Sequence, residues 1–299
     1  MSDRALRLGR WGLGLAIVAV LAISLDPRAL AERLAATDLR LAAIGVAGLT
    51  AVHLVPAETW RMLCRRLGGA SLAWRESVTA YYAAQALGGV TPANLGGDIY
   101  RVHALRSSGN GFEGAVAPVV VQRATSYLAL SLIGMAALAF LAAQSGVSVF
   151  LASPALAVAV LGAALAGLLL AGGGPFERLR GWAIAMLGGG TAATSSDTWR
   201  TRVRAGAGIG LSLGLVFHLV SVLFTLLLVA AVDPAAVTPA SLAALAVARL
   251  SLAVPISPSG LGVQEGALSA LFVGIGLSPE IALAALLLGR ISLLSTTVV

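Results

Sequence analysis

The sequence predicts an all-α integral membrane protein with about six full transmembrane helices and two re-entrant broken hairpins in an inverted-topology repeat. Three observations carry this prediction: the apolar composition, the placement of the arginines, and two short apolar runs that end in Gly-Pro breaks. Of the 299 residues, 58% are hydrophobic and 11% are charged, whereas soluble domains carry about 25% charged residues. This composition excludes a soluble globular enzyme, a disordered regulator and a nucleic-acid-binding module.

The net charge of +7 comes from arginines that gather on one side of the predicted bundle. Under the positive-inside rule that side is cytoplasmic, so the charge indicates membrane orientation rather than binding to nucleic acid. The basic segments on that side are 61–75, 101–106 and 172–205. Three further arginines, Arg28, Arg33 and Arg40, lie in a predicted outer loop. We expect a multi-pass protein of the bacterial cytoplasmic (inner) membrane with both termini in the cytoplasm.

Six apolar runs are predicted to cross the membrane fully. They are residues 11–25, 41–57, 115–143, 147–171, 207–232 and 281–299. The first run follows Arg4, Arg7 and Arg10, which is also the charge pattern of a secretory signal peptide. Because no clear small-x-small cleavage site follows that run, we expect an uncleaved first helix.

Two further apolar runs are too short to cross the bilayer. Residues 77–90 give a helix of roughly 21 Å against a hydrocarbon core of about 30 Å. This run leads into paired glycines and Pro92, which interrupt a helix. The second run, residues 240–254, leads into Pro255 in the same way. We predict re-entrant hairpins at about 77–106, opening to the cytoplasm, and at about 240–277, opening to the outside.

The two broken segments belong to a longer internal repeat. Landmark residues recur in the same order at offsets of 165 to 167: His53 and His218, Thr91 and Ser257, Asp98 and Gln264, and Arg123 and Arg290. The halves 1–146 and 147–299 have opposite predicted orientations. Inverted repeats with paired broken helices are typical of secondary transporters, whose binding site lies near the bilayer midplane. The alternative is chance similarity between two Gly/Pro breaks in a sequence of low diversity.

Charged residues within the predicted membrane region are candidates for a binding site, because burying a charge in hydrocarbon costs about 2.5 kcal/mol or more. An arginine in a water-accessible cavity suits a phosphate group, since its planar fork donates two hydrogen bonds and stays charged. The helix N-termini after the two glycine breaks would add N–H donors for an anion. The predicted substrate-binding residues are Asn94, Gly96, Gly97, Asp98, Arg123, Arg249, Gly260, Gly262, Gln264, Glu265 and Arg290.

Two interpretations of these charges stay open. In one, Asp98 pairs with Arg123 and Glu265 pairs with Arg290, so that each pair locks a hairpin to the helix that follows. In the other, the arginines contact substrate. The two are compatible, because a salt bridge that exchanges for a lipid phosphate can gate a cavity. Arg249 has no counterpart in the first half and is expected to face a substrate or water cavity.

Other polar residues have less specific predictions. His53 and His218 either couple transport to protons or hydrogen-bond between helices as neutral side chains. Arg101 and Arg106 are expected at the membrane interface, with side chains that reach the cytoplasmic head groups. The single cysteine, Cys64, excludes a CxxC redox or zinc site, and we expect no catalytic set, metal or cofactor.

Four stretches of the chain carry a family resemblance. They are 58–68 with its tryptophan and arginines, 91–101 (T-P-A-N-L-G-G-D-I-Y-R), 257–266 (S-P-S-G-L-G-V-Q-E-G) and 288–290. On these motifs the chain resembles the lysylphosphatidylglycerol synthase transmembrane (flippase-like) family over nearly its whole length. It departs from the family pattern at Gln122-Arg123 and Ser126, where the family places Glu-Arg and an Asp three residues after the Arg. The resemblance implies lipid translocation without lysine transfer, since the soluble aminoacyltransferase domain is absent.

The leading hypothesis is therefore a flippase-like transporter, not an enzyme, that moves an anionic phospholipid or a polyprenyl or glycolipid head group between leaflets. Its substrate partner would be a membrane lipid. One alternative is an accessory membrane subunit that partners an enzyme of lipid modification or glycolipid synthesis. A further alternative is an intramembrane head-group transferase, for which the sequence offers no catalytic set.

Overall fold

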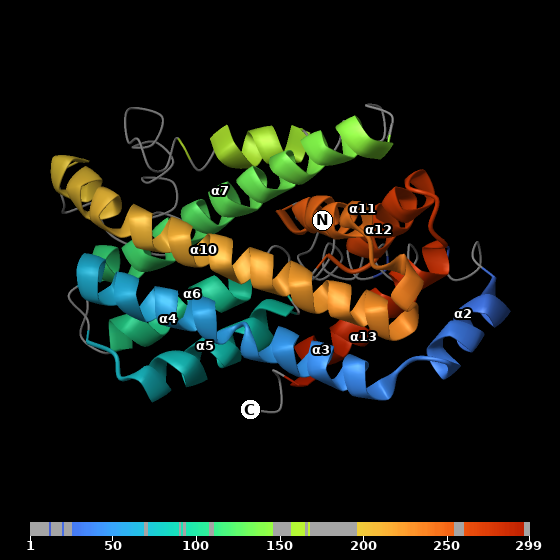
Figure 1. The fold of residues 1–299 in the computed structure, drawn as a ribbon. Helices are drawn as coiled ribbons and strands as arrows, with labels where there is room; N and C mark the ends of the chain where they lie inside the picture. Colours follow the sequence, from blue (N-terminus) through green and yellow to red (C-terminus); the bar gives the residue numbers. More distant parts are fainter. Residues whose placement is uncertain are drawn as a thin grey trace.

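A computed structural model of the protein describes residues 12, 20, 26–68, 71–89, 91, 94–107, 111–145, 157–164, 167, 196–253 and 260–295. Every regular element within these ranges is helical, which confirms the all-α prediction. Two long helices, α7 (Phe112–Ser145) and α10 (Ser196–Val232), cross and pack against each other in the bundle (Figure 1). The pair α3 (Leu39–Ala51) and α4 (Leu54–Leu63) lies beside α10.

Three stretches in the described part of the chain are long and apolar enough to cross a membrane. They are Leu39–Leu67, Gly114–Gln144 and Val203–Val232, and they coincide with the predicted spans 41–57, 115–143 and 207–232. The predicted span 11–25 lies outside the described residues except for 12 and 20, and 147–171 does so except for 157–164 and 167. The predicted last span begins as α13 (Pro279–Ser295). The total of six spans stays a prediction.

The predicted second span carries a break between α3 and α4 that hydropathy does not reveal. Pro56 has no N–H, so it cannot donate to the Val52 carbonyl oxygen, which instead accepts from the Val55 N–H at 3.0 Å. The Pro56 carbonyl oxygen accepts from Gln122 Nε2 of α7 at 2.7 Å. This proline therefore bends the helix and supplies a contact to its neighbour.

The predicted outer loop after the first span contains a short helix, α2 (Pro27–Ala35). Asp26 caps α2 by accepting from two backbone N–H groups, and Pro27 occupies the first turn, where a missing N–H costs nothing. Arg33 Nη1 lies 2.5 Å from Asp233 Oδ2, which ties α2 to the C-terminal end of α10. One end of the bundle is therefore built from the segments before α3 and after α10.

The opposite end of the bundle is rich in arginine. A π-helical turn, η1 (Cys64–Gly68), continues α4, and Arg66 Nη1 donates to the Ala205 carbonyl oxygen at 3.3 Å. This basic turn thus lies beside the N-terminal part of α10. The basic segment 172–205, which we expected to be a loop between two spans, is helical over 196–205, so that expectation is wrong there, while 172–195 lies outside the described residues.

The first predicted hairpin contains two helices that pack side by side, α5 (Trp74–Gly89) and α6 (Leu95–Ser107). Gly97 allows this approach, because a Cβ at that position would lie 2.4 Å from the Ala84 carbonyl oxygen. Asn94 adopts a φ of +57° immediately before α6, in the left-handed region that asparagine tolerates. Close backbone packing therefore positions the first turn of α6.

The second predicted hairpin contains α11 (Pro239–Ala248), the 3-10 turn η3 (Arg249–Ala253) and α12 (Val263–Gly274). Gly260 and Gly262 have φ values of +67° and +80°, a conformation that favours glycine. The residues between η3 and Gly260 lie outside the described part of the chain. Here the backbone conformation, rather than close helix packing, sets the start of the second short helix.

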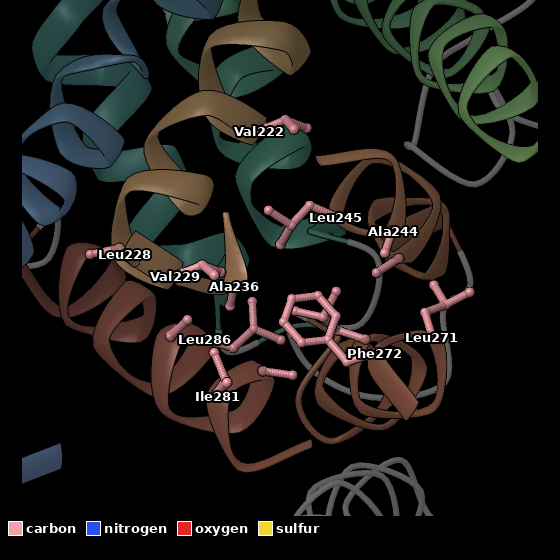
Figure 2. Packing of buried hydrophobic residues seen from close by; sticks show 14 of the residues in the cluster. Val222, Leu228, Val229, Ala236, Ala244, Leu245, Leu271, Phe272, Ile281 and Leu286 are labelled. Carbon is pink, nitrogen blue, oxygen red and sulfur yellow. The ribbon is translucent and has the colours of Figure 1, made fainter. Parts of the chain in front are cut away.

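Several apolar clusters hold the bundle together, and two of them contain the short helices α12 and α6 that follow the breaks. The larger one joins α10, α11, α12 and α13 around the fully buried ring of Phe272, against which Leu245, Ile281 and Leu286 pack (Figure 2). The smaller one joins α4, α6 and α7 around the fully buried Trp60. Each short helix that follows a break is thus anchored by its own apolar core.

Candidate functional site

A cavity of about 320 Å³ lies where the helices of the two predicted halves meet. Its walls come from α3 to α7 of the first half and from α10, η3, α12 and α13 of the second. Among the described residues, the charged side chains in its lining are all arginines: Arg101, Arg123, Arg249 and Arg290. Uncharged polar side chains also line it, among them Asn94, Gln122, Gln264 and Ser292. The apolar bundle therefore encloses a polar, cationic interior.

On the first-half side of this cavity, Asp98 is shared between two arginines. Arg123 Nε of α7 donates to Asp98 Oδ2 at 2.6 Å, and Arg101 of α6 forms an ion pair with Asp98 Oδ1. Arg123 also donates to the Tyr127 hydroxyl at 2.9 Å. The predicted pairing of Asp98 with Arg123 is confirmed.

Arg101 is buried inside the bundle, so the prediction that its side chain reaches the cytoplasmic head groups is wrong. Its side chain is 6% exposed, and its Nη1 donates to Gln122 Oε1 at 2.6 Å. The guanidinium carbon lies 5.2 Å from the centre of the Tyr81 ring. The spacing of three residues from Asp98 puts both side chains on one face of α6, and that spacing is the signal that could have revealed the pair.

On the second-half side, Glu265 is held by one arginine and by the backbone. Glu265 Oε1 accepts from Arg290 Nε of α13 at 2.8 Å, which confirms the second predicted pair. Its Oε2 accepts from the Gly262 N–H at 2.8 Å, so Glu265 also caps α12. The side chain of Glu265 is 1% exposed.

The two ion pairs share one local design. The carboxylate precedes the arginine by 25 residues in both. In each pair the carboxylate lies in the first turn of a short helix, and the arginine Nε of the next helix donates to it. This agreement accords with the repeat inferred from the landmark residues.

Arg249 has no carboxylate partner in the part of the chain that the structure describes. Its guanidinium carbon lies 5.9 Å from the centre of the Phe217 ring, and its buried Nε has no hydrogen-bond acceptor. A buried donor without an acceptor beside a cavity is suited to bind an acceptor that enters it. The expectation that Arg249 faces a cavity is confirmed.

Both histidines line the cavity beside the ring of Phe217. His218 Nε2 of α10 lies 3.0 Å from Ser126 Oγ of α7, so it links two helices, as one of the two interpretations predicted. His53 Nδ1 instead lies 2.9 Å from the Leu49 carbonyl oxygen of α3, so it bonds locally.

The remaining predicted residues differ in their roles. Asn94, Gly260 and Gln264 line the cavity, and Asn94 Nδ2 donates to Gln85 Oε1 at 2.9 Å. Gly97 is instead required for the packing of α6 against α5.

The expected backbone donors are already engaged at two of the glycines. The Gly96 N–H donates to Thr91 Oγ1 at 2.9 Å, and the Gly262 N–H donates to Glu265. The prediction that these N–H groups are open to an anion is therefore wrong. Local side chains satisfy them, because a buried N–H without an acceptor is costly.

The charges around the cavity do not balance. Four arginines line it, and two carboxylates pair with them, which leaves a formal excess of two positive charges among the described residues. In an apolar bundle this excess favours an anion, since charges in a medium of low dielectric constant interact strongly. Tyr127, which the sequence analysis did not single out, adds a hydroxyl four residues after Arg123.

Comparison with known proteins places these features in a family. The chain matches, over residues 11–299, the family model described as Lysylphosphatidylglycerol synthase TM region. A comparison with curated proteins finds no match. No aminoacyltransferase domain is evident within the chain. Since the match covers nearly the whole chain and agrees with the apolar helices, the protein is a membrane protein that belongs to the lysylphosphatidylglycerol synthase transmembrane-region family.

Proposed function

We propose that this protein is a flippase-like transporter that carries the anionic head group of a lipid through the cavity while the acyl or polyprenyl tails stay in the bilayer. The observation that carries the proposal is the formal excess of positive charge that the described residues place around the cavity, where Arg249 has no carboxylate partner among them. Guanidinium groups bind phosphate oxygens bidentately and stay charged, so they suit a lipid phosphate.

The outer faces of the long helices support this arrangement. Large apolar side chains are exposed on α3, α7 and α10, for example Ile44, Leu132 and Leu223. In a bilayer such side chains face lipid, whereas the polar cavity is enclosed between the helices. A head group can therefore enter a polar site while its tails stay against an apolar surface.

The proposal includes two re-entrant hairpins of opposite orientation within the halves 1–146 and 147–299. Ser77 Oγ at the start of α5 donates to the Ala57 carbonyl oxygen of α4 at 2.8 Å, on the side of the arginine-rich end. The chain enters α11 from the other end, next to Asp233 and its ion pair with Arg33. By the positive-inside rule the arginine-rich end is cytoplasmic, in a bacterial inner membrane with both termini inside.

A flipping assay tests the proposal. The purified protein is reconstituted in phosphatidylcholine vesicles that contain a trace of NBD-labelled phosphatidylglycerol, and dithionite bleaching measures the exchange between leaflets. We expect Arg249→Gln and Arg123→Gln to reduce the rate to that of protein-free vesicles. Arg65→Gln removes an exposed arginine outside the cavity and should keep the wild-type rate.

Wild-type rates in both cavity variants would remove the site assignment. A wild-type protein that does not accelerate exchange of the anionic probe would contradict the transporter proposal and favour an accessory role in the membrane.

A further inference from the structure

The two carboxylates differ in what holds them when their arginine leaves. Asp98 pairs with both Arg101 and Arg123, and its side chain is 14% exposed. Glu265 pairs with Arg290 among the described arginines, and its other oxygen is occupied by a backbone N–H. If Arg123 turns away, Asp98 keeps a cation, whereas a departing Arg290 leaves a buried carboxylate without one. Only the first exchange avoids an unpaired buried charge.

The two arginines on Asp98 also differ from each other. Arg101 is fixed by its hydrogen bond to Gln122, and its guanidinium carbon lies 5.8 Å from the Trp60 ring and 5.2 Å from the Tyr81 ring. Arg123 is 25% exposed and lines the cavity. Both arginines line the cavity, but Arg101 is only 6% exposed, so Arg123 is the one more open to a ligand.

We propose that Arg123 exchanges Asp98 for the phosphate group of the substrate, and that Arg101 is the positioning residue that keeps Asp98 paired during this exchange. The inference rests on the proposed function and deepens it. Before the exchange Asp98 is shared by two arginines, and afterwards Arg101 holds Asp98 while Arg123 holds the phosphate. Each of these charged groups has a partner of opposite charge in both states. The pair Glu265–Arg290 keeps the start of α12 in place and does not exchange.

The exchange makes a specific prediction about variants of Arg101. In Arg101→Gln the Asp98 carboxylate has Arg123 as its remaining partner among the described residues. It therefore holds Arg123 in the ion pair, and Arg123 can no longer bind the substrate phosphate. Adding Asp98→Asn removes the competing carboxylate and releases Arg123 again. The double variant D98N/R101Q has the net charge of the wild type. The double variant E265Q/R101Q has that net charge too, but it retains Asp98.

The test is the flipping rate of NBD-labelled phosphatidylglycerol in phosphatidylcholine vesicles, with folding checked by size-exclusion chromatography and circular dichroism. We expect R101Q to lower the rate about tenfold and D98N/R101Q to restore it to within about threefold of the wild type. E265Q/R101Q should stay as slow as R101Q. Arg101→Lys keeps a cation beside Asp98 and should retain most of the flipping rate. If a double variant does not fold, the difference in rate between R101K and R101Q tests the exchange instead.

Equal rescue by both double variants would mean that net charge alone matters, and it would overturn the exchange. A failure of folded D98N/R101Q to recover, or equal rates for R101K and R101Q, would overturn it as well. These results leave the proposed function standing if the wild type flips the probe. A wild type without flipping activity overturns both proposals.

Discussion

The helix pair α5–α6 and the segment α11–η3–α12 each bring one carboxylate to arginines that line the cavity, and they do so by different means. In the first, close packing at Gly97 positions the helix, and the described contacts of the Asp98 carboxylate are ion pairs with Arg101 and Arg123. In the second, positive-φ glycines set the helix, and Glu265 itself caps it. In the first region the residue that positions the helix, Gly97, differs from the residue that carries the charge, Asp98. In the second region Glu265 does both. Binding and stability should therefore respond differently to equivalent substitutions.

The strongest test of this difference is the loss of the arginine from each pair. Arg290→Gln leaves Glu265 buried without a cation and should lower the free energy of unfolding by about 3–5 kcal/mol. Arg123→Gln leaves Asp98 paired with Arg101 and should cost about 1 kcal/mol. Thermal unfolding in detergent micelles measures both. Equal losses of stability in the two variants would break the comparison.

Glycine substitutions sharpen the same comparison at the backbone. Gly97→Ala puts a methyl group 2.4 Å from the Ala84 carbonyl oxygen, and overpacking of this kind costs about 1–3 kcal/mol. Gly262→Ala forces a φ of +80° on an L-residue and should cost about 1–2 kcal/mol.

The matched control is Gly208→Ala in α10, where a Cβ meets no atom within 4 Å. Alanine should stabilise this helix by up to about 1 kcal/mol. Unfolding transitions that are unchanged in the Gly97 and Gly262 variants would contradict the packing and backbone roles assigned to these residues.

A small effect is expected at the end of the bundle far from the arginine-rich turn. The ion pair between Arg33 and Asp233 is partly solvated, with side chains 39% and 21% exposed. Arg33→Ala should therefore cost about 0.2–1 kcal/mol, and less at high salt. A loss as large as that of Arg290→Gln would contradict the view that burial makes the Glu265–Arg290 pair the more important of the two for stability.

Both buried ion pairs could be predicted from the sequence because a carboxylate and a guanidinium in a medium of low dielectric constant have few partners besides each other. Arg249 was predicted to face a cavity because it interrupts an apolar run without a counterpart in the other half. Hydropathy located the membrane-spanning parts of α7 and α10, Gly114–Gln144 and Val203–Val232, within a few residues, but it did not reveal that α10 begins as early as Ser196.

Other features of the site depend on contacts between helices that are far apart in the sequence, which the sequence of a single helix does not reveal. Arg101 was misplaced because its position after the first break suggested an interfacial residue, whereas its partners on α4, α5 and α7 become visible only in the folded bundle. The engagement of the Gly96 N–H by Thr91 depends on a local turn of the backbone. The cavity itself follows from how α7 and α10 cross the helices of both halves.

The central claim is that a cationic cavity selects an anionic head group, and charge selectivity of exchange tests it most directly. NBD-labelled phosphatidylglycerol and NBD-labelled phosphatidylcholine are compared in vesicles of one composition, with wild-type protein and with Arg249→Gln. We expect the wild type to exchange the anionic lipid faster than the zwitterionic one, and Arg249→Gln to abolish this preference. Equal rates for both lipids in the wild type, or a preference that persists without Arg249, would contradict the account.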